Sequence, residues 1–203
     1  MVVLRHAAEG MDVIEIPGFA VNYKDVFNMQ YIYHVLHEWM IENGWATRDD
    51  SEFGERDYIQ RENPSFGKEI WVRWRFFKDP PAEDPFIQYK LNIDMHAIGL
   101  KEVETVINNK KVKADKCELD IACALHIVVN YEKYTKGTFL QKYRNLIIDK
   151  LYHKKIDYHK REAYREGRRL QEAIKEYLKL HKYGHAVEFE GLWNKTVREY
   201  PKQ

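Results

Sequence analysis

The sequence predicts an α+β fold in which an N-terminal amphipathic helix packs on a long antiparallel β-meander and a long helical segment follows. Three observations predict it. Apolar residues recur with helical spacing between 25 and 43, apolar and polar residues alternate over strands within about 58–133, and helical spacing returns after Gly137. We therefore expect an α+β domain over 1–137 and a basic helical segment with a packed tail over 138–203.

The composition is that of a globular protein with an uneven distribution of charge. Of 203 residues, 44% are hydrophobic and 32% are charged, and the formal net charge is +1. Residues 1–137 carry 17 Lys and Arg against 23 Asp and Glu, a net charge of −6, whereas residues 138–182 carry 13 against 6, a net charge of +7. This asymmetry predicts either that the helical segment docks on the acidic domain or that it binds an anionic partner.

Several features favour a soluble, cytoplasmic protein with no membrane partner. The N-terminal residues lack the basic and continuous apolar regions of a signal peptide. The longest uncharged run of the sheet region, Ile121–Tyr131, is too short for a membrane helix. Cys117 and Cys123 share one face of a predicted strand about 20 Å apart, which is too far for a disulfide.

The N-terminal helix is expected between two recognisable end signals. A short edge strand, Met11–Ile16, is expected to stop at Pro17 and Gly18. Asp25 then offers an N-cap, and Asn43–Gly44 offers a C-terminal stop. The apolar positions between them form one stripe that would pack on the sheet: Ile32, Val35, Leu36, Trp39 and Met40.

Three stretches alternate apolar and polar residues and predict strands with one buried face. Their apolar positions are every second residue of 70–76, 87–95 and 117–131. A one-residue slip between two strands would turn an apolar face outward. The two residue numbers of each opposed pair must therefore sum to an even value between the last two strands and to an odd value between the first two, a condition called parity below. With a three-residue loop between the last two strands, Ile93 would lie opposite Leu125; against the preceding strand, Arg73 would lie opposite Lys90.

The C-terminal helical segment carries a sparse heptad stripe. The stripe consists of Ile156, Ala163, Leu170 and Tyr177, joined by Gly167, Ile174 and His181. A continuous helix over Phe139–Lys182 would span about 65 Å, more than a small domain. The helix is therefore expected either to break near Lys154–Tyr158, where Asp157 would cap a second helix, or to project; docking on the acidic domain remains open.

Two groups of polar residues are candidates for chemistry. His34, His37 and Glu38 are spaced to converge on a metal ion from one helical turn, but no motif completes a ligand set, and a solvated helix face explains them equally well. Asp94, His96 and His126 share the polar face of the sheet and are the candidates for acid–base catalysis. The expected register places His96 and His126 opposite Ala122 and Asn92 rather than opposite each other. We therefore expect neither a metal nor another cofactor, and we favour a non-enzymatic protein.

The order of helix, meander and long C-terminal helix resembles that of helix-grip ligand-binding domains at the level of the fold. The resemblance carries no functional residues across, but a long curved antiparallel sheet that grips a helix is a common way to form a cavity for a small apolar ligand. The side chains that would line it are those of Trp39, Trp74, Phe76, Tyr89, Leu91, Met95 and Leu125. The alternative is that the same residues fill the core.

The basic helical segment predicts a third class of function. Exposed cations with interleaved tyrosines are typical of nucleic-acid surfaces, although carboxylates interrupt the run here. The candidate contact residues are Lys154, Lys155, Arg161, Arg165, Arg168 and Arg169. Long strands and a sparse stripe also leave apolar surface that another copy can cover. The first expectation is therefore a self-associating binding or assembly protein, with ligand binding and nucleic-acid binding as alternatives.

Overall fold

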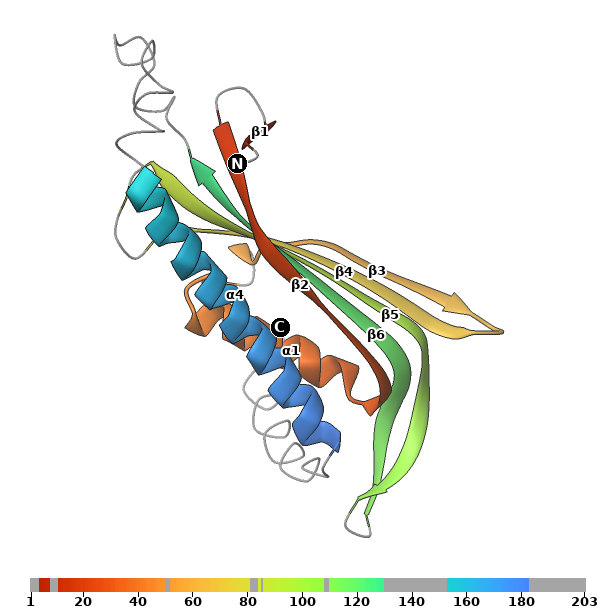
Figure 1. Ribbon diagram of the computed structural model, residues 1–203. Helices are drawn as coiled ribbons and strands as arrows, with labels where there is room; N and C mark the ends of the chain where they lie inside the picture. Colours follow the sequence, from red (N-terminus) through yellow and green to blue (C-terminus); the bar gives the residue numbers. More distant parts are fainter. Residues whose placement is uncertain are drawn as a thin grey trace.

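A computed structural model describes residues 4–7, 11–49, 52–80, Asp84, 86–107, 110–129 and 153–182. Within these residues, six antiparallel strands form one sheet in the order β1-β2-β6-β5-β4-β3, and two helices lie on one of its faces (Figure 1). The elements are β1 (Leu4–Ala7), β2 (Met11–Phe27), α1 (Met29–Glu42), β3 (Glu55–Asn63), β4 (Gly67–Lys78), β5 (Ile87–Ile107), β6 (Lys110–Val129) and α4 (His153–Lys182). The predicted α+β class, with its antiparallel meander and N-terminal helix, is confirmed.

The N-terminal strand is much longer than the sequence predicted. β2 continues through Pro17 and Gly18 to Phe27, and its register against β6 shifts between Ile16 and Phe19. Proline is tolerated there because the residues sit in a β-bulge. A Cβ on Gly18 would overlap the carbonyl oxygen of Cys123, so glycine lets the two backbones approach.

The helix α1 consequently begins later than predicted. Asp25 belongs to β2, and the N-cap is Asn28, whose side-chain oxygen accepts the backbone N–H of Tyr31 at 2.9 Å. The predicted stop at Asn43 is correct, since the helix ends at Glu42 with Asn43 as the C-cap. Both cap residues satisfy backbone groups that the helix itself leaves unpaired.

The meander has the predicted faces but a different register. Ile93 lies opposite Cys123 rather than Leu125, and Arg73 lies opposite Asp94 rather than Lys90. These offsets are even numbers, two and four residues, so the predicted apolar faces remain on the buried side over the described residues; Tyr131 lies outside them. A second bulge, between Ile98 and Lys101, shifts the β5–β6 register.

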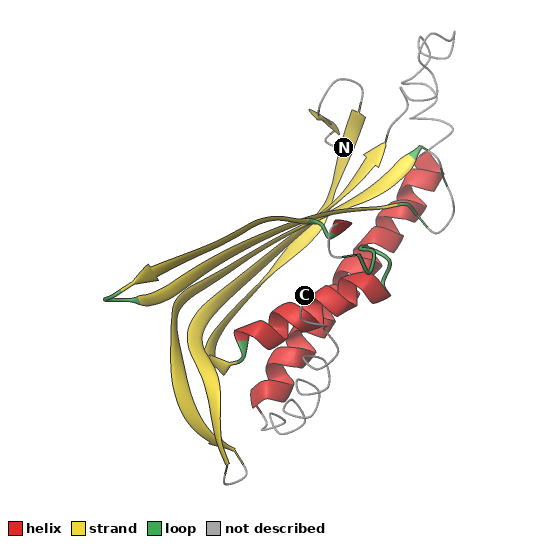
Figure 2. Cartoon of the chain, turned by 180° about the vertical axis from the view of Figure 1, so that it is seen from behind, coloured by secondary structure: helices red, strands yellow, loops and turns green. Residues whose placement is uncertain are grey.

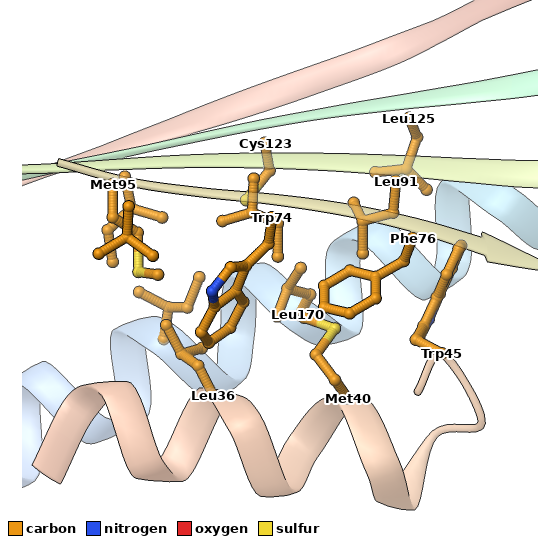
Figure 3. Packing of buried hydrophobic residues seen from close by; sticks show 14 of the residues in the cluster. Leu36, Met40, Trp45, Trp74, Phe76, Leu91, Met95, Cys123, Leu125 and Leu170 are labelled. Atoms are coloured by element: carbon orange, nitrogen blue, oxygen red, sulfur yellow. The ribbon is translucent and has the colours of Figure 1, made fainter. Parts of the chain in front are cut away.

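The core lies between the sheet and the two helices (Figure 3). On α1, Met29, Ile32, Leu36 and Met40 are buried. The stripe of α4 is buried in the same cluster: Ile156, Ala163, Leu170, Ile174 and Tyr177, with Leu178 beside them. Residues 154–158 lie within one helix, so the predicted break and the Asp157 cap are wrong.

The burial of this stripe also decides how α4 is placed. The helix packs against β2 and β6 of its own sheet instead of projecting (Figure 1). The stripe therefore no longer supports self-association, although the long strands still do.

No helix among the described residues is long and apolar enough to cross a membrane. Cys117 and Cys123 are both buried and free, as expected.

Candidate functional site

A groove of about 750 Å³ lies between α1 and the outer part of the sheet. The strands β5 and β6 are far longer than α1; toward their hairpin end they extend past the helix and bend to the side of the sheet on which the helices lie (Figure 2). Five elements line the groove, through Asn28, Met29, Gln30, Tyr33, His34, Tyr58, Gln60, Lys68, Ile70, Leu100, Glu102, Lys113, Ala114 and Asp115. Its volume falls within the range of small-molecule sites.

The groove combines apolar side chains with a fixed aromatic wall. Met29, Ile70 and Leu100 are buried core residues that reach the groove. Tyr33 packs edge-to-face on Tyr58, with ring centroids 6.5 Å apart. These side chains give the groove an apolar wall against which a ligand can pack without disturbing the core.

The aromatic wall is held by one carboxylate behind it. The Tyr33 hydroxyl donates to Glu55 Oε2 at 2.7 Å, and the Trp74 indole Nε1 donates to the same oxygen at 3.0 Å. Burial, reinforced by Glu55, raises the pKa of the Tyr33 hydroxyl, which therefore stays protonated and keeps donating. This network fixes the ring of Tyr33 at the edge of the groove.

The charged side chains of the groove differ in how they are satisfied. Asp115 Oδ2 accepts the backbone N–H of Met29 at 3.1 Å, which occupies that carboxylate and one N–H group of the helix terminus. Glu102 lies opposite Asp115 on β5 and is exposed. Lys68 is half-buried, and its side chain has neither a hydrogen bond nor an ion pair with any residue that the structure describes. Lys113 also lines the groove but is exposed, so Lys68 is the half-buried cation that can meet an acidic group there.

The predicted ligand residues lie elsewhere. Six of them are no more than 3% exposed and fill the core: Trp74, Phe76, Tyr89, Leu91, Met95 and Leu125. Trp39 is half-buried on α1 and packs against that core. None of the seven lines the groove, because the groove opens where the sheet extends beyond the helices rather than beneath them.

The three candidate metal ligands do not converge on one point. His34 lies at the groove, whereas the ring of His37 stacks on Phe53 with centroids 4.2 Å apart. Glu38 Oε1 lies 3.8 Å from His37 Nδ1. Within the described ranges, no three His, Cys, Asp or Glu side chains are grouped to hold a metal ion.

The candidate acid–base residues share the open face of the sheet but have different partners. His96 Nε2 lies 2.8 Å from Glu69 Oε1, and the ring stacks on Trp71. Asp94 accepts from Arg75 at 2.6 Å. His96 lies opposite Asp120, not Ala122 as predicted, and no catalytic pair is formed with Asp94.

His126, the third candidate, is placed where its charge is disfavoured. The expected register sets it opposite Asn92, but its partners across the sheet are Lys90 on β5 and Glu15 on β2. Burial and then the charge of Lys90 lower the pKa of His126, and its Nδ1 has no hydrogen-bond partner among the described residues. The imidazole is therefore neutral near pH 7.

The basic residues of α4 lie on its exposed side. Arg165 pairs with Glu162 at 2.6 Å, Lys155 with Asp84 at 3.4 Å, and Arg168 donates to Gln171. The other candidates, Lys154, Arg161 and Arg169, are exposed too. Pairing along the helix makes this surface less available to an anionic partner than the count of cations implies.

A buried histidine was missed by the sequence reasoning. His159 is only 2% exposed, and its Nδ1 lies 2.8 Å from the hydroxyl of Tyr89, which is also buried. Burial lowers the pKa of His159, whereas the nearby Asp84 carboxylate acts in the opposite direction. Its position on the α4 stripe, three residues after Ile156, is the signal that predicts burial.

The buried His159 predicts that stability falls in mild acid. Below its ordinary pKa of 6.5 the unfolded chain binds a proton that the folded chain resists, so stability decreases as the pH falls from about 6.5 toward the folded pKa. One such group contributes a slope of at most about 1.4 kcal/mol per pH unit. Urea unfolding at several pH values should show a shallower slope for His159→Asn, whose amide can still bond to Tyr89. The exposed His153→Asn should keep the wild-type slope; equal slopes for all three proteins would contradict the prediction.

No protein-family model matches the chain, and no curated protein sequence matches it. The fold and the groove nevertheless define a class: an α+β domain whose curved antiparallel sheet holds two helices on one face and leaves a ligand-sized groove beyond them. The site residues are therefore assigned by geometry alone.

Proposed function

We propose that the protein binds a small organic molecule, with an apolar body and an acidic end, in the groove between α1 and the outer part of the sheet. The observation that carries the proposal is the groove itself, about 750 Å³ in volume, which combines apolar side chains with a half-buried lysine. Small-molecule sites typically pair an apolar surface with a few convergent polar groups.

The residues of the groove suit the two ends of such a molecule. Met29, Ile70 and Leu100 supply the surface for the apolar body, and Tyr58 supplies an exposed ring. The side chain of Lys68, which has no hydrogen-bond or ion-pair partner among the described residues, would pair with the acidic end. The role is one of binding, because the groove brings together no nucleophile and base in hydrogen-bond contact among the residues described.

Titration with 1-anilinonaphthalene-8-sulfonate tests the proposal, because this fluorescent probe has an apolar aromatic body and one sulfonate. Gln30→Trp places a large side chain at the groove from an exposed position, and should weaken probe binding at least tenfold. Lys68→Gln removes the cation and should weaken binding roughly fivefold.

The matched control is Glu38→Trp, which adds the same ring at an exposed position on the same helix, outside the groove lining. It should bind the probe as the wild type does. If Gln30→Trp and Glu38→Trp bind equally well, the probe does not enter the groove and the proposal fails. Native mass spectrometry of the purified protein provides an independent readout, since a retained ligand would be lost from Gln30→Trp alone.

A further inference from the structure

The strand β3 ends the sheet with an edge that pairs with no other strand among the described residues. It is nine residues long, and every residue from Tyr58 onward is exposed. Tyr58 and Ile59 are 52% and 51% exposed, which is unusual for large apolar side chains in a strand. Such an edge is a template for another strand.

The charged residues of β3 are arranged so that two antiparallel copies of the strand would place opposite charges against each other. Around Ile59, the chain reads Arg56-Asp57-Tyr58-Ile59-Gln60-Arg61-Glu62. When two copies pair antiparallel with Ile59 opposite itself, Asp57 faces Arg61. Arg56 lies at the bulge where the β3–β4 register shifts between Glu55 and Asp57, and it would be the cation nearest Glu62 of the other copy. Each pair occurs twice, so the two-fold arrangement places four opposite-charge pairs across the interface.

Neighbouring registers lose most of this complementarity. The next register that keeps the faces of both sheets aligned is centred on Gln60, and it sets Ile59 against Arg61 and Tyr58 against Glu62. The register centred on Tyr58 sets Asp57 against Ile59 and Arg56 against Gln60, and it retains only Glu55 against Arg61. The pattern of charges therefore selects Ile59 as the centre.

We propose that β3 pairs with β3 of a second copy of this chain, centred on Ile59, to join the two sheets into one of twelve strands. Such an interface is isologous, so it closes at a dimer and leaves no further edge of this kind. Within each chain Asp57 lies 3.5 Å from Arg73, and the guanidinium of Arg61 lies over the ring of Trp71 at 6.0 Å. In the dimer Asp57 would lie between two arginines.

The centre of the interface is tested with Ile59→Cys. Directly opposed residues have Cβ atoms about 4.5–5.5 Å apart, within reach of a disulfide, so mild oxidation should link the two chains. Ile98→Cys, which replaces another exposed isoleucine, on β5, should remain unlinked. The native Cys117 and Cys123 do not interfere, because burial raises the pKa of each thiol to about 12.

The charges are tested with reversals at Arg56 and Glu62, neither of which has an ion pair within the described part of its own chain. Light scattering coupled to size exclusion should show a dimer for the wild type. Arg56→Glu and Glu62→Arg should each weaken it roughly tenfold, since two attractive pairs become repulsive. The double reversal should restore it.

Three outcomes would overturn the proposal. They are a wild-type monomer at every concentration, a dimer that neither single reversal weakens, and a disulfide that forms at position 98 as readily as at position 59. Recovery in the double reversal distinguishes a specific pairing from a loss of folding, because the double variant contains both substitutions. The result does not depend on the groove, whose probe is measured separately.

Discussion

Replacing Leu170 with Asp is expected to destabilise the protein by about 5 kcal/mol or more, enough to prevent folding of many domains. Leu170 is 1% exposed and lies in the cluster between α4, α1 and the sheet (Figure 3). The substitution removes the burial of a leucine, about 1.5–3 kcal/mol, and adds an unpaired carboxylate in an apolar site. Urea unfolding of the full chain, followed by circular dichroism, measures the loss.

Two further variants make this result interpretable. Leu170→Ala keeps the site apolar and should cost about 2–5 kcal/mol, so unfolding remains measurable if the aspartate variant does not fold. Arg169→Asp introduces the same charge one residue earlier, at an exposed position, and should change stability by about 0.5 kcal/mol or less. Similar losses at positions 169 and 170 would mean that α4 does not dock through its stripe.

The helix also shows which part of the fold the sequence could predict. The positions of Ile156, Ala163, Leu170 and Tyr177 identify a buried face, because local spacing alone decides which side chains share a face. The spacing does not say what covers that face. A second copy and the protein's own sheet bury the same stripe equally well, so the choice required the tertiary structure.

The strands show the same division between local and tertiary information. Parity was correct for Ile93 and Arg73, because burial fixes which face a residue occupies. The offset was wrong, because it depends on the lengths of the connections and on bulges, such as the one between Ile98 and Lys101, that alternation does not reveal. At Pro17 and Gly18 the local signal was misleading: both residues normally end strands, and here they form the bulge that lets β2 continue.

The groove was not predicted, because the pocket expected from the sequence consists of the most apolar residues. Those residues fill the core, whereas the groove combines apolar side chains with polar ones such as Gln30 and Lys68. A signal was present in the lengths of the elements. The 21 residues of β5 span about 70 Å, whereas the 14 residues of α1 span about 21 Å, so the helix cannot cover the sheet.

Trp74→Ala is expected to cost about 3–5 kcal/mol and to loosen the groove as well. Trp74 is fully buried and extends from the sheet toward Leu36 of α1 (Figure 3). Its ring also contacts Tyr33, at a centroid distance of 5.1 Å, and its indole N–H satisfies Glu55. Removing the indole leaves a cavity beneath Tyr33. It also removes one of the two side-chain donors of Glu55, the carboxylate that holds the Tyr33 hydroxyl.

Trp71→Ala is the matched control, since it removes the same side chain three residues earlier on the same strand. Trp71 lies on the open face, half-buried against His96, so its loss should cost about 1 kcal/mol and leave the groove intact. Urea unfolding measures the stabilities. Binding of 1-anilinonaphthalene-8-sulfonate reports on the groove, and it is measured at urea concentrations where both variants remain folded. Weaker probe binding in Trp74→Ala alone would connect the core to the groove through Tyr33 and Glu55. Equal stability losses in the two variants would contradict the assignment of the buried face, because only one of these tryptophans lies between the sheet and α1.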